Sequence, residues 1–177
     1  MKHLLALFAC SIQFALAFGQ DTWHKTVVTP DWTISLPGEV STRDVQHLFM
    51  IYTGSLDSNM YMAQYAEEVL DVNAGNLGSR YTAFLKGLAE SQLKVFTYTV
   101  KDTSLGGTSG KFVRFTAPSP QYNFQRIYYY VTIANGHICS SVMYCKRAPT
   151  DQDLADQRIF YTSVLFKAGN IRENGFH

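Results

Sequence analysis

His137 and Cys139 are the pair of side chains in this sequence that most resembles a catalytic or metal-binding arrangement. Residues two apart on a β-strand point to the same face, so the imidazole and the thiol could act as base and nucleophile or as two metal ligands. Adjacent positions alone do not create an activated thiolate. No cysteine or carboxylate completes a zinc spacing with the histidines of the mature chain, which are His24, His47, His137 and His177. We therefore expect no catalytic residue, no metal and no cofactor.

Three further motifs have ordinary structural explanations. The segment Gly106–Lys111 is rich in glycine like a phosphate-binding loop, but Leu105 and Phe112 stand where that motif requires glycine and a hydroxyl residue. We interpret it as the turn of a β-hairpin. The carboxylates at 67–71 are expected to mark a solvated strand end, and those at 151–156 suit the positive end of a helix. Because no Gly-x-Ser-x-Gly motif occurs either, we expect no enzymatic activity.

The first 19 residues predict export. Lys2 gives a charged start, the apolar run Leu4–Phe18 follows, and small residues stand at its end, as in a secretory signal peptide. Cleavage after Gly19 is preferred, and cleavage after Ala17 is the alternative. The run is too short and interrupted for a membrane span, which needs about 20 apolar residues. A lipoprotein anchored through Cys10 is not favoured, because too little apolar sequence would precede the cysteine.

The mature chain 20–177 is expected to form one periplasmic or secreted domain with no stable membrane span. Loss of Lys2 with the signal reduces the 15 basic residues to the number of acidic residues, which is 14. A neutral chain without a basic run is not expected to bind nucleic acid. Cys139 and Cys145 remain, and six residues of extended strand would hold their Cα atoms roughly 20 Å apart. A disulfide cannot span that distance, so we expect two separate thiols.

The segment Arg126–Cys145 is the strongest structural prediction. Asn135-Gly136 lies between two β-rich runs and favours a type I′ turn, because both central residues of that turn need a positive φ. A two-residue turn fixes the register, so Arg126 is expected to face Cys145. One face of the hairpin is expected to be core; it carries Ile127, Tyr129, Val131, Ile133, Ile138, Val142 and Tyr144.

The other face of this hairpin is the candidate binding surface. Tyrosine, arginine and methionine are enriched at recognition sites. The residues expected to contact a ligand or partner are Arg126, Tyr128, Tyr130, Thr132, His137 and Met143. Two interpretations stay open at this point. Either a helix covers this face and makes it a second buried face, or the face lines a partly open groove, which arginine and hydroxyl groups would suit better than a core.

The remaining elements are predicted from apolar periodicity. Residues 77–88 predict a helix with Asn76 as its N-cap, and Thr150 is expected to cap a second helix. Residues 60–67 could be helical, but their aromatic residues fall at every second position and favour a strand. Further strands are expected at 33–36, 45–53, 94–100 and 111–116. No βαβ alternation is present, which predicts an antiparallel α+β domain.

The order of several segments carries a family resemblance. These segments are Asp31–Gly38, the expected helix Tyr81–Leu93, Leu105–Gly110 with Phe112–Phe115 after it, the tyrosine-rich hairpin, and the ending Ile159–Phe166. In this order they resemble the PsbP-like family, small exported bacterial proteins related in fold to the photosystem II extrinsic protein PsbP and to a Ran-binding nuclear import factor. The resemblance implies an antiparallel β-sheet flanked by helices on both faces, an α/β/α sandwich. It also implies a binding or accessory role, and it transfers no functional residue.

The sequence therefore predicts an exported, non-catalytic binding or accessory protein of the cell envelope. Its partner is expected to be another envelope protein or a small ligand. One alternative is a small-ligand carrier with an apolar pocket between sheet and helix, lined by Tyr128, Tyr130 and Met143. The other is an envelope hydrolase or redox enzyme, which would need His137, Cys139 or the aspartates to converge with other polar groups in a cleft.

Overall fold

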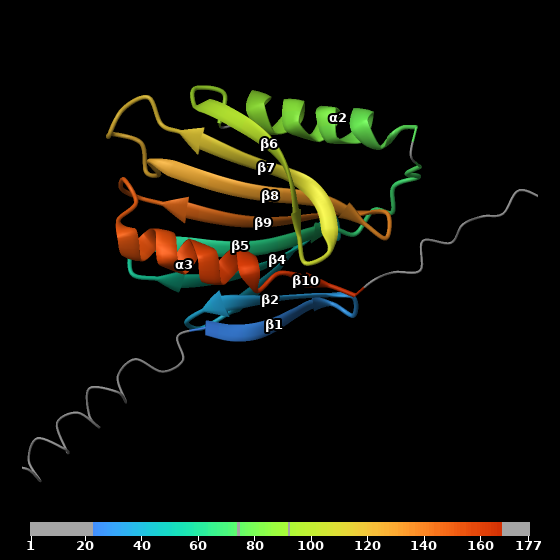
Figure 1. Cartoon of the computed structure of the whole chain (residues 1–177), viewed down its shortest axis with the longest axis horizontal. Helices are drawn as coiled ribbons and strands as arrows, with labels where there is room; N and C mark the ends of the chain where they lie inside the picture. Colours follow the sequence, from blue (N-terminus) through green and yellow to red (C-terminus); the bar gives the residue numbers. More distant parts are fainter. Residues whose placement is uncertain (1–22, 74, 92, 168–177) are drawn as a thin grey trace, which may run out of the picture.

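The computed structural model describes residues 23–73, 75–91 and 93–167. This part of the chain forms ten strands and two helices (Figure 1). In chain order, they are β1 (Trp23–Thr29), β2 (Trp32–Pro37), β3 (Ser41–Val45), β4 (Phe49–Leu56), β5 (Asn59–Ala66), α2 (Leu77–Glu90), β6 (Thr97–Leu105), β7 (Thr108–Thr116), β8 (Arg126–Ala134), β9 (His137–Cys145), α3 (Asp151–Thr162) and β10 (Leu165–Phe166).

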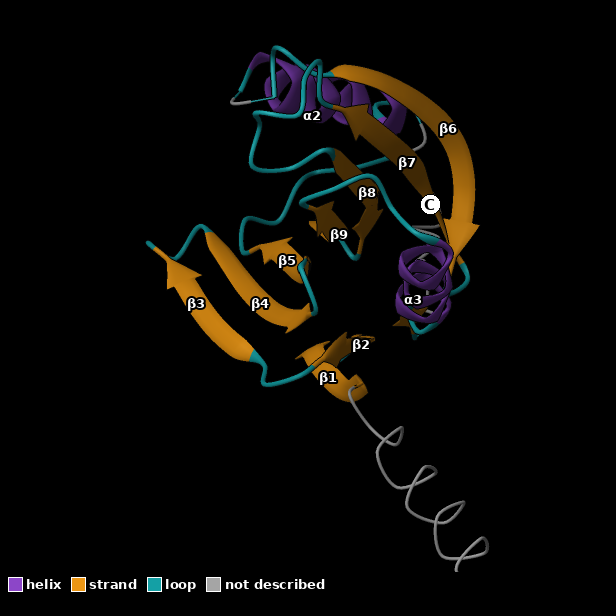
Figure 2. Ribbon diagram, turned by 90° about the vertical axis from the view of Figure 1, so that its left-hand side faces the viewer, coloured by secondary structure: helices purple, strands orange, loops and turns teal. Residues whose placement is uncertain are grey.

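The strands form two antiparallel sheets. The larger sheet has seven strands in the order β3-β4-β5-β9-β8-β7-β6, and the smaller has three in the order β1-β2-β10. The larger sheet is strongly curved (Figure 2). Its concave side faces β1, β2 and α3, whereas α2 lies on its convex side. A small sheet and one helix thus close the open side of a curved sheet.

The hairpin of β8 and β9 is confirmed in its turn and its register. Asn135 and Gly136 have φ values of 52° and 82°, which few residues other than asparagine and glycine adopt readily. The register pairs Arg126 with Cys145, as predicted. Cys139 and Cys145 are both buried free thiols, because the continuous strand β9 holds them apart. The prediction of two separate thiols is therefore confirmed.

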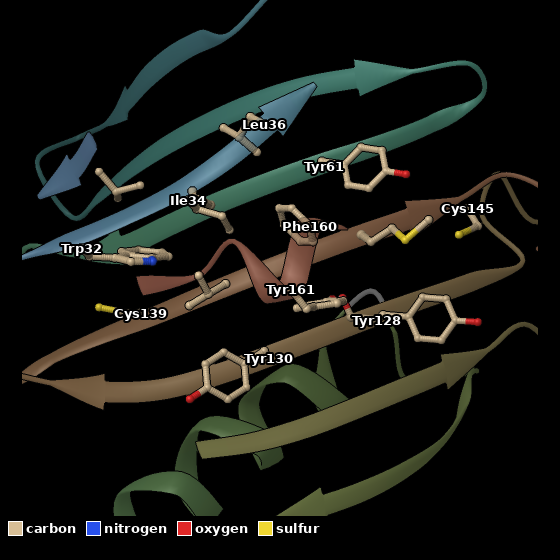
Figure 3. Packing of buried hydrophobic residues seen from close by; sticks show 14 residues of the cluster. Trp32, Ile34, Leu36, Tyr61, Tyr128, Tyr130, Cys139, Cys145, Phe160 and Tyr161 are labelled. Atoms are coloured by element: carbon tan, nitrogen blue, oxygen red, sulfur yellow. The ribbon is translucent and has the colours of Figure 1, made fainter. Parts of the chain in front are cut away.

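The inner, concave face of the large sheet carries the main core. Buried side chains from β2, β5, β8, β9 and α3 point toward one another there (Figure 3). Tyr130 donates a hydrogen bond through its hydroxyl to Thr108 O at 2.5 Å, and Tyr161 donates to Tyr128 O at 2.8 Å. The Tyr130 ring packs directly against Gly110. A Cβ at that position would come within 2.8 Å of the ring, so the ring fits only because residue 110 is a glycine. These hydroxyls are buried at little cost because each has an acceptor.

The outer face carries a smaller core under α2. Leu85 and Leu88 of α2 pack against a buried cluster, which consists of Val113, Phe115, Ile127, Tyr129 and Val142. The hairpin face that the sequence predicted as core is therefore buried at its centre. Toward the turn, Ile133 and Ile138 are only half-buried. The two hairpin faces are thus both covered, and the face carrying Tyr128 and Tyr130 belongs to the larger core.

The predicted α+β fold class, an α/β/α sandwich, is wrong. Strands account for 50% of the described residues and helices for 18%, so the domain is mainly β. The layer over the inner face is built by α3 together with β1, β2 and β10, not by helices alone. Strands β1 and β10 were not expected. In β1 the apolar residues do not alternate, and β10 has only two residues and follows α3 after two positions, so neither has a sequence signal of its own.

The strand predictions differ in their outcome. Residues 60–67 lie in β5, which confirms a strand over a helix. The strand expected at 45–53 is interrupted, because Gln46 and His47 have φ values of 55° and 57° and form a turn in which Leu48 N donates to Val45 O at 3.0 Å. The glycine-rich segment 106–111 contributes the turn of the β6–β7 hairpin, as predicted.

The two predicted helix caps also differ in whether the side chain makes the capping hydrogen bond. Thr150 caps α3 as predicted, through a reciprocal pair of hydrogen bonds with Asp153, the capping box. Asn76 stands at the N-cap of α2, but its side chain makes no capping hydrogen bond. Neither helix in the described part of the chain is long and apolar enough to cross a bilayer. The predicted signal peptide, residues 1–19, and Cys10 lie outside the described residues.

Candidate functional site

Four hairpin turns and strand β10 meet at one end of the molecule, which we call the turn end. The turns comprise residues 29–32, 45–49, 105–108 and 134–137. Hydrogen bonds link these segments: Phe166 N donates to Gly106 O at 3.3 Å, Lys167 N to Asp31 O at 2.8 Å, and Glu67 N to Leu48 O at 3.0 Å. Segments far apart in sequence are therefore held at fixed positions around the turn end.

A pocket of about 410 Å³ opens at the turn end between the two sheets. Its lining includes two carboxylates, of Asp31 and Glu67, and two aromatic rings, of Tyr65 and Phe166. No lysine or arginine is among its lining residues. The ring of Phe166 is fixed by stacking on Trp32, with centroids 5.4 Å apart and planes 15° apart. The pocket lining thus combines aromatic surface with two carboxylates and no basic side chain.

The carboxylate of Asp31 is positioned by both flanking elements. Its backbone N donates to Thr29 Oγ1 at 3.3 Å within the β1–β2 turn. Asn135 of the β8–β9 turn donates through Nδ2 to Asp31 Oδ2 at 3.1 Å. The other carboxylate oxygen, Oδ1, makes no hydrogen bond with the described residues and is available to a ligand at this exposed position.

His137 presents one ring nitrogen as an acceptor. Its Nδ1 lies 2.8 Å from the backbone carbonyl oxygen of Ala66, and a carbonyl can only accept, so Nδ1 carries the proton. In the neutral ring Nε2 then has a free lone pair. The ring also lies edge-on to Tyr65, with centroids 6.0 Å apart. His137 is therefore oriented from two sides, and its Nε2 is the remaining polar atom.

Cys139 lines the same pocket and is a buried thiol. Burial raises the pKa of its thiol to about 12, so the nucleophilic thiolate is almost absent near neutral pH. Its Sγ lies 3.8 Å from the backbone oxygen of His137, to which it donates a weak hydrogen bond. The His137–Cys139 pair does share a strand face, but its geometry is not that of a base and a nucleophile.

A second polar group lies beside the pocket. Oxygen or nitrogen atoms of Asp44, His47 and Glu67 all lie within 4.8 Å of one another. His47 donates through Nδ1 to Asp44 Oδ2 and through its backbone N to Asp44 Oδ1, both at 2.8 Å. Among the described residues, these three form the group of histidine, cysteine or carboxylate side chains close enough together to hold one metal ion.

The six residues of the predicted binding surface divide into two sets. Tyr128, Tyr130, Thr132 and Met143 are buried in the main core, with at most 7% of each exposed. Arg126 is half-buried and donates to the neighbouring Gln125 O. His137 is also half-buried, and it alone of the six lines the pocket at the turn end.

Sequence reasoning missed most residues of the pocket. The sequence places Asp31 only within the family resemblance, Glu67 at a solvated strand end, and Asn135 in a hairpin turn. No local pattern links these positions, because they belong to turns and strand ends of two different sheets that pack together. One signal was present: the turn expected at Asn135-Gly136 places His137 at the end of a sheet, where half-exposed polar groups can gather.

No family model and no curated protein matches this chain. The resemblance to PsbP-like proteins therefore stays an expectation from the sequence.

Proposed function

We propose that this is an exported, non-catalytic binding protein that holds a small ligand in the pocket at the turn end. The observation that carries the proposal is the lining of this pocket. Asp31, Glu67 and His137 Nε2 offer acceptors and negative charge, while Tyr65 and Phe166 offer aromatic surface. Such a combination suits a small organic cation, whose charge pairs with the carboxylates and whose apolar part contacts the rings.

A binding role is favoured over catalysis by the state of the polar groups. The pKa of Cys139 is raised to about 12, which supports an inert structural thiol. His137 donates to a backbone carbonyl rather than to a carboxylate, so it lacks the orienting acid of a catalytic triad. The proposed export follows from residues 1–19, and the proposed partner is a small ligand.

A matched set of probes tests the proposal by isothermal titration calorimetry. Phenethylamine, 2-phenylethanol and 3-phenylpropionate share an aromatic ring and differ in head-group charge. We expect phenethylamine to bind at least tenfold more tightly than 3-phenylpropionate, because the pocket lining carries two carboxylates and no basic side chain. Equal binding of the three probes, or no binding by any of them, would contradict the proposal.

Two charge-neutralising variants test whether the preference for the amine probe arises in this pocket. Asp31→Asn should weaken phenethylamine binding about tenfold while leaving 2-phenylethanol within twofold, because only the amine uses the negative charge. Asp151→Asn is the matched control, since it removes one exposed carboxylate at the start of α3, outside the pocket. Loss of amine binding in the control as well would assign the preference to overall charge and not to this pocket.

A second candidate, docking of another envelope protein, is favoured by one observation. Strand β6 lies at the edge of the large sheet, and Tyr98 and Val100 on it are 50% and 41% exposed. Such an edge can accept an added strand from a partner. A partner bound at this edge should be released by Val100→Lys and kept by Lys25→Ala on β1, which leaves β6 unchanged. Equal release by both variants would exclude the edge.

A further inference from the structure

We propose that Asp44, His47 and Glu67 form a site for a divalent transition-metal ion, with Zn²⁺ as its probe. The donor atoms of the three side chains lie within 4.8 Å of one another. Asp44 lies near the end of β3, His47 lies in the β3–β4 turn, and Glu67 follows strand β5. The backbone bond from Glu67 N to Leu48 O, at 3.0 Å, ties the two segments together. The ligand set is therefore assembled before any ion arrives.

The β3–β4 turn has a backbone that its residues disfavour. Gln46 and His47 both have positive φ, which costs roughly 1 kcal/mol or more for each residue with a side chain other than glycine or asparagine. Asp44 offsets this cost by accepting two hydrogen bonds from His47, one from the backbone and one from the ring. The result is that the imidazole is turned back over the carboxylate. The same two atoms, Nδ1 and Oδ2, would face an ion placed between them.

Neither carboxylate of the group forms an ion pair with a lysine or arginine of the described residues. Two carboxylates, of Asp44 and Glu67, come within 4.8 Å of each other. Like charges at this separation repel. A divalent cation would neutralise both carboxylates at once.

The donor set selects the class of ion. One imidazole nitrogen and two carboxylate oxygens suit Zn²⁺ and its transition-metal neighbours better than Ca²⁺ or Mg²⁺, which prefer oxygen ligands alone. Zn–N and Zn–O bonds of about 2.0–2.2 Å place neighbouring tetrahedral ligands roughly 3.4 Å apart. Donors that are up to 4.8 Å apart must therefore draw closer together, whereas Nδ1 of His47 and Oδ2 of Asp44, which are 2.8 Å apart, must separate slightly. The exposed side chains can do so by small rotations. The ion takes the place of the Nδ1 proton of His47, which leaves to solvent, while Nε2 carries a proton, so that a neutral imidazole binds the ion.

The metal site does not depend on the ligand proposed for the pocket, although it shares Glu67 with the pocket lining. An ion bound there would neutralise one of the two carboxylates of the pocket. Zinc should therefore weaken phenethylamine binding by the wild type. In His47→Ala, which keeps the whole pocket lining, zinc should not affect it. This competition distinguishes the two proposals, because each binding event is also measured alone.

Calorimetric titration with ZnCl₂ of the protein without a polyhistidine tag tests the site directly. We expect one ion per chain in the wild type, and at least tenfold weaker binding by His47→Ala and by Glu67→Gln. His24→Ala is the matched control, because His24 is another exposed histidine, on β1 and outside the group. The zinc affinity of this variant should stay within twofold of the wild type. Absence of saturable binding, or unchanged affinity in His47→Ala, would overturn the site.

Thermal unfolding of the same variants shows whether a loss of zinc binding comes from the missing ligand or from a damaged fold. Without metal, His47→Ala and Glu67→Gln should melt within a few degrees of the wild type, since neither side chain is part of the core. Zinc should raise the wild-type melting temperature, because it binds the native state. It should leave that of His47→Ala unchanged. Equal stabilisation of both would show that zinc binds elsewhere and would reject the proposal.

Discussion

Acidic side chains lie near both ends of strand β5, and they differ in whether the chain supplies their hydrogen-bond partners. At its start, Asn59 donates to Asp153 at 2.6 Å, and Asp153 also accepts from the backbone and hydroxyl of Thr150 at 2.7 Å and from Arg147. We call this group the helix end. Beyond the last residue of β5, the carboxylate of Glu67 has no such partner among the described residues, and the nearby Asp44 is bound only by His47.

The difference separates structural charge from available charge. Asp153 is only 2% exposed and its acceptor positions are occupied by the chain itself. Glu67 is half-buried, lines a pocket and approaches a second carboxylate. A buried carboxylate that the chain satisfies stabilises the fold, whereas one that the chain leaves open is available to a cation. The presence of acidic residues therefore does not by itself indicate a cation site. The hydrogen-bond partners of each carboxylate show whether it is available to a cation.

The largest effect is expected from removing the centre of the helix end. Asp153→Ala should lower the free energy of unfolding by about 3 kcal/mol, because it removes the capping box of α3 and the buried partner of Asn59. Urea unfolding at pH 7 measures this loss. Asp151→Ala is the control within the same first helical turn, and we expect a loss of about 0.5 kcal/mol from its exposed position. Similar losses in both would contradict a structural role specific to Asp153.

The helix end also predicts how stability depends on pH. Burial alone would raise the pKa of Asp153, but hydrogen bonds from Thr150, Arg147 and Asn59 outweigh burial and hold it well below the usual range. The folded state therefore binds the proton less readily than the unfolded chain, whose aspartates titrate near 3.9. This stabilisation is complete above about pH 5 and is lost as the pH falls toward the folded pKa.

Urea unfolding between pH 7 and pH 3 checks this dependence. The wild type should lose more stability over this range than Asp153→Ala, since the variant lacks the depressed carboxyl. Parallel pH profiles for the two proteins would assign the acid sensitivity to other groups.

A smaller effect is expected from the cap alone. Thr150→Ala should cost about 1 kcal/mol, because the hydroxyl that bonds Asp153 is lost while Arg147 and Asn59 still hold the carboxylate. Thr150→Ser retains the hydroxyl and should stay within about 0.5 kcal/mol of the wild type. Chemical unfolding curves with equal slopes would make these comparisons valid. A serine variant as unstable as the alanine variant would argue that the methyl group matters instead.

The smallest effect on stability is expected at the turn end. Glu67→Gln should change the free energy of unfolding by no more than about 0.5 kcal/mol, as is usual for surface substitutions. The loss of its repulsion with Asp44 contributes a small stabilisation. If this substitution cost as much as Asp153→Ala, the contrast between the two ends would be wrong.

Local signals predicted some of these features well. The Asn135-Gly136 turn, the register that separates Cys139 from Cys145, and the Thr150 cap each depend on residues close in sequence. The signal for a helix start at Thr150 was sound because capping is a local hydrogen-bond pattern. Such features can be predicted from one sequence.

Features that depend on distant segments could not be predicted in the same way. The hydroxyl of Tyr130 looked poorly suited to a core, yet the carbonyl of Thr108 on a neighbouring strand satisfies it. The turn at Gln46-His47 has no favourable turn residues and depends on Asp44. Asp31 and Glu67 meet only because two sheets pack together. The fold class was wrong for the same reason, since the second sheet has few signals of its own.

The most direct test of the account asks which end of β5 a small organic cation contacts. Backbone amide NMR of the isotope-labelled protein, titrated with phenethylamine, reports this residue by residue. We predict saturable shifts for the amides of Asp31, Glu67 and His137 at the turn end, and none for Asn59 and Asp153 at the helix end. Shifts confined to the helix end, or no shifts at the turn end at saturating probe, would contradict the assignment of the turn end as the binding site.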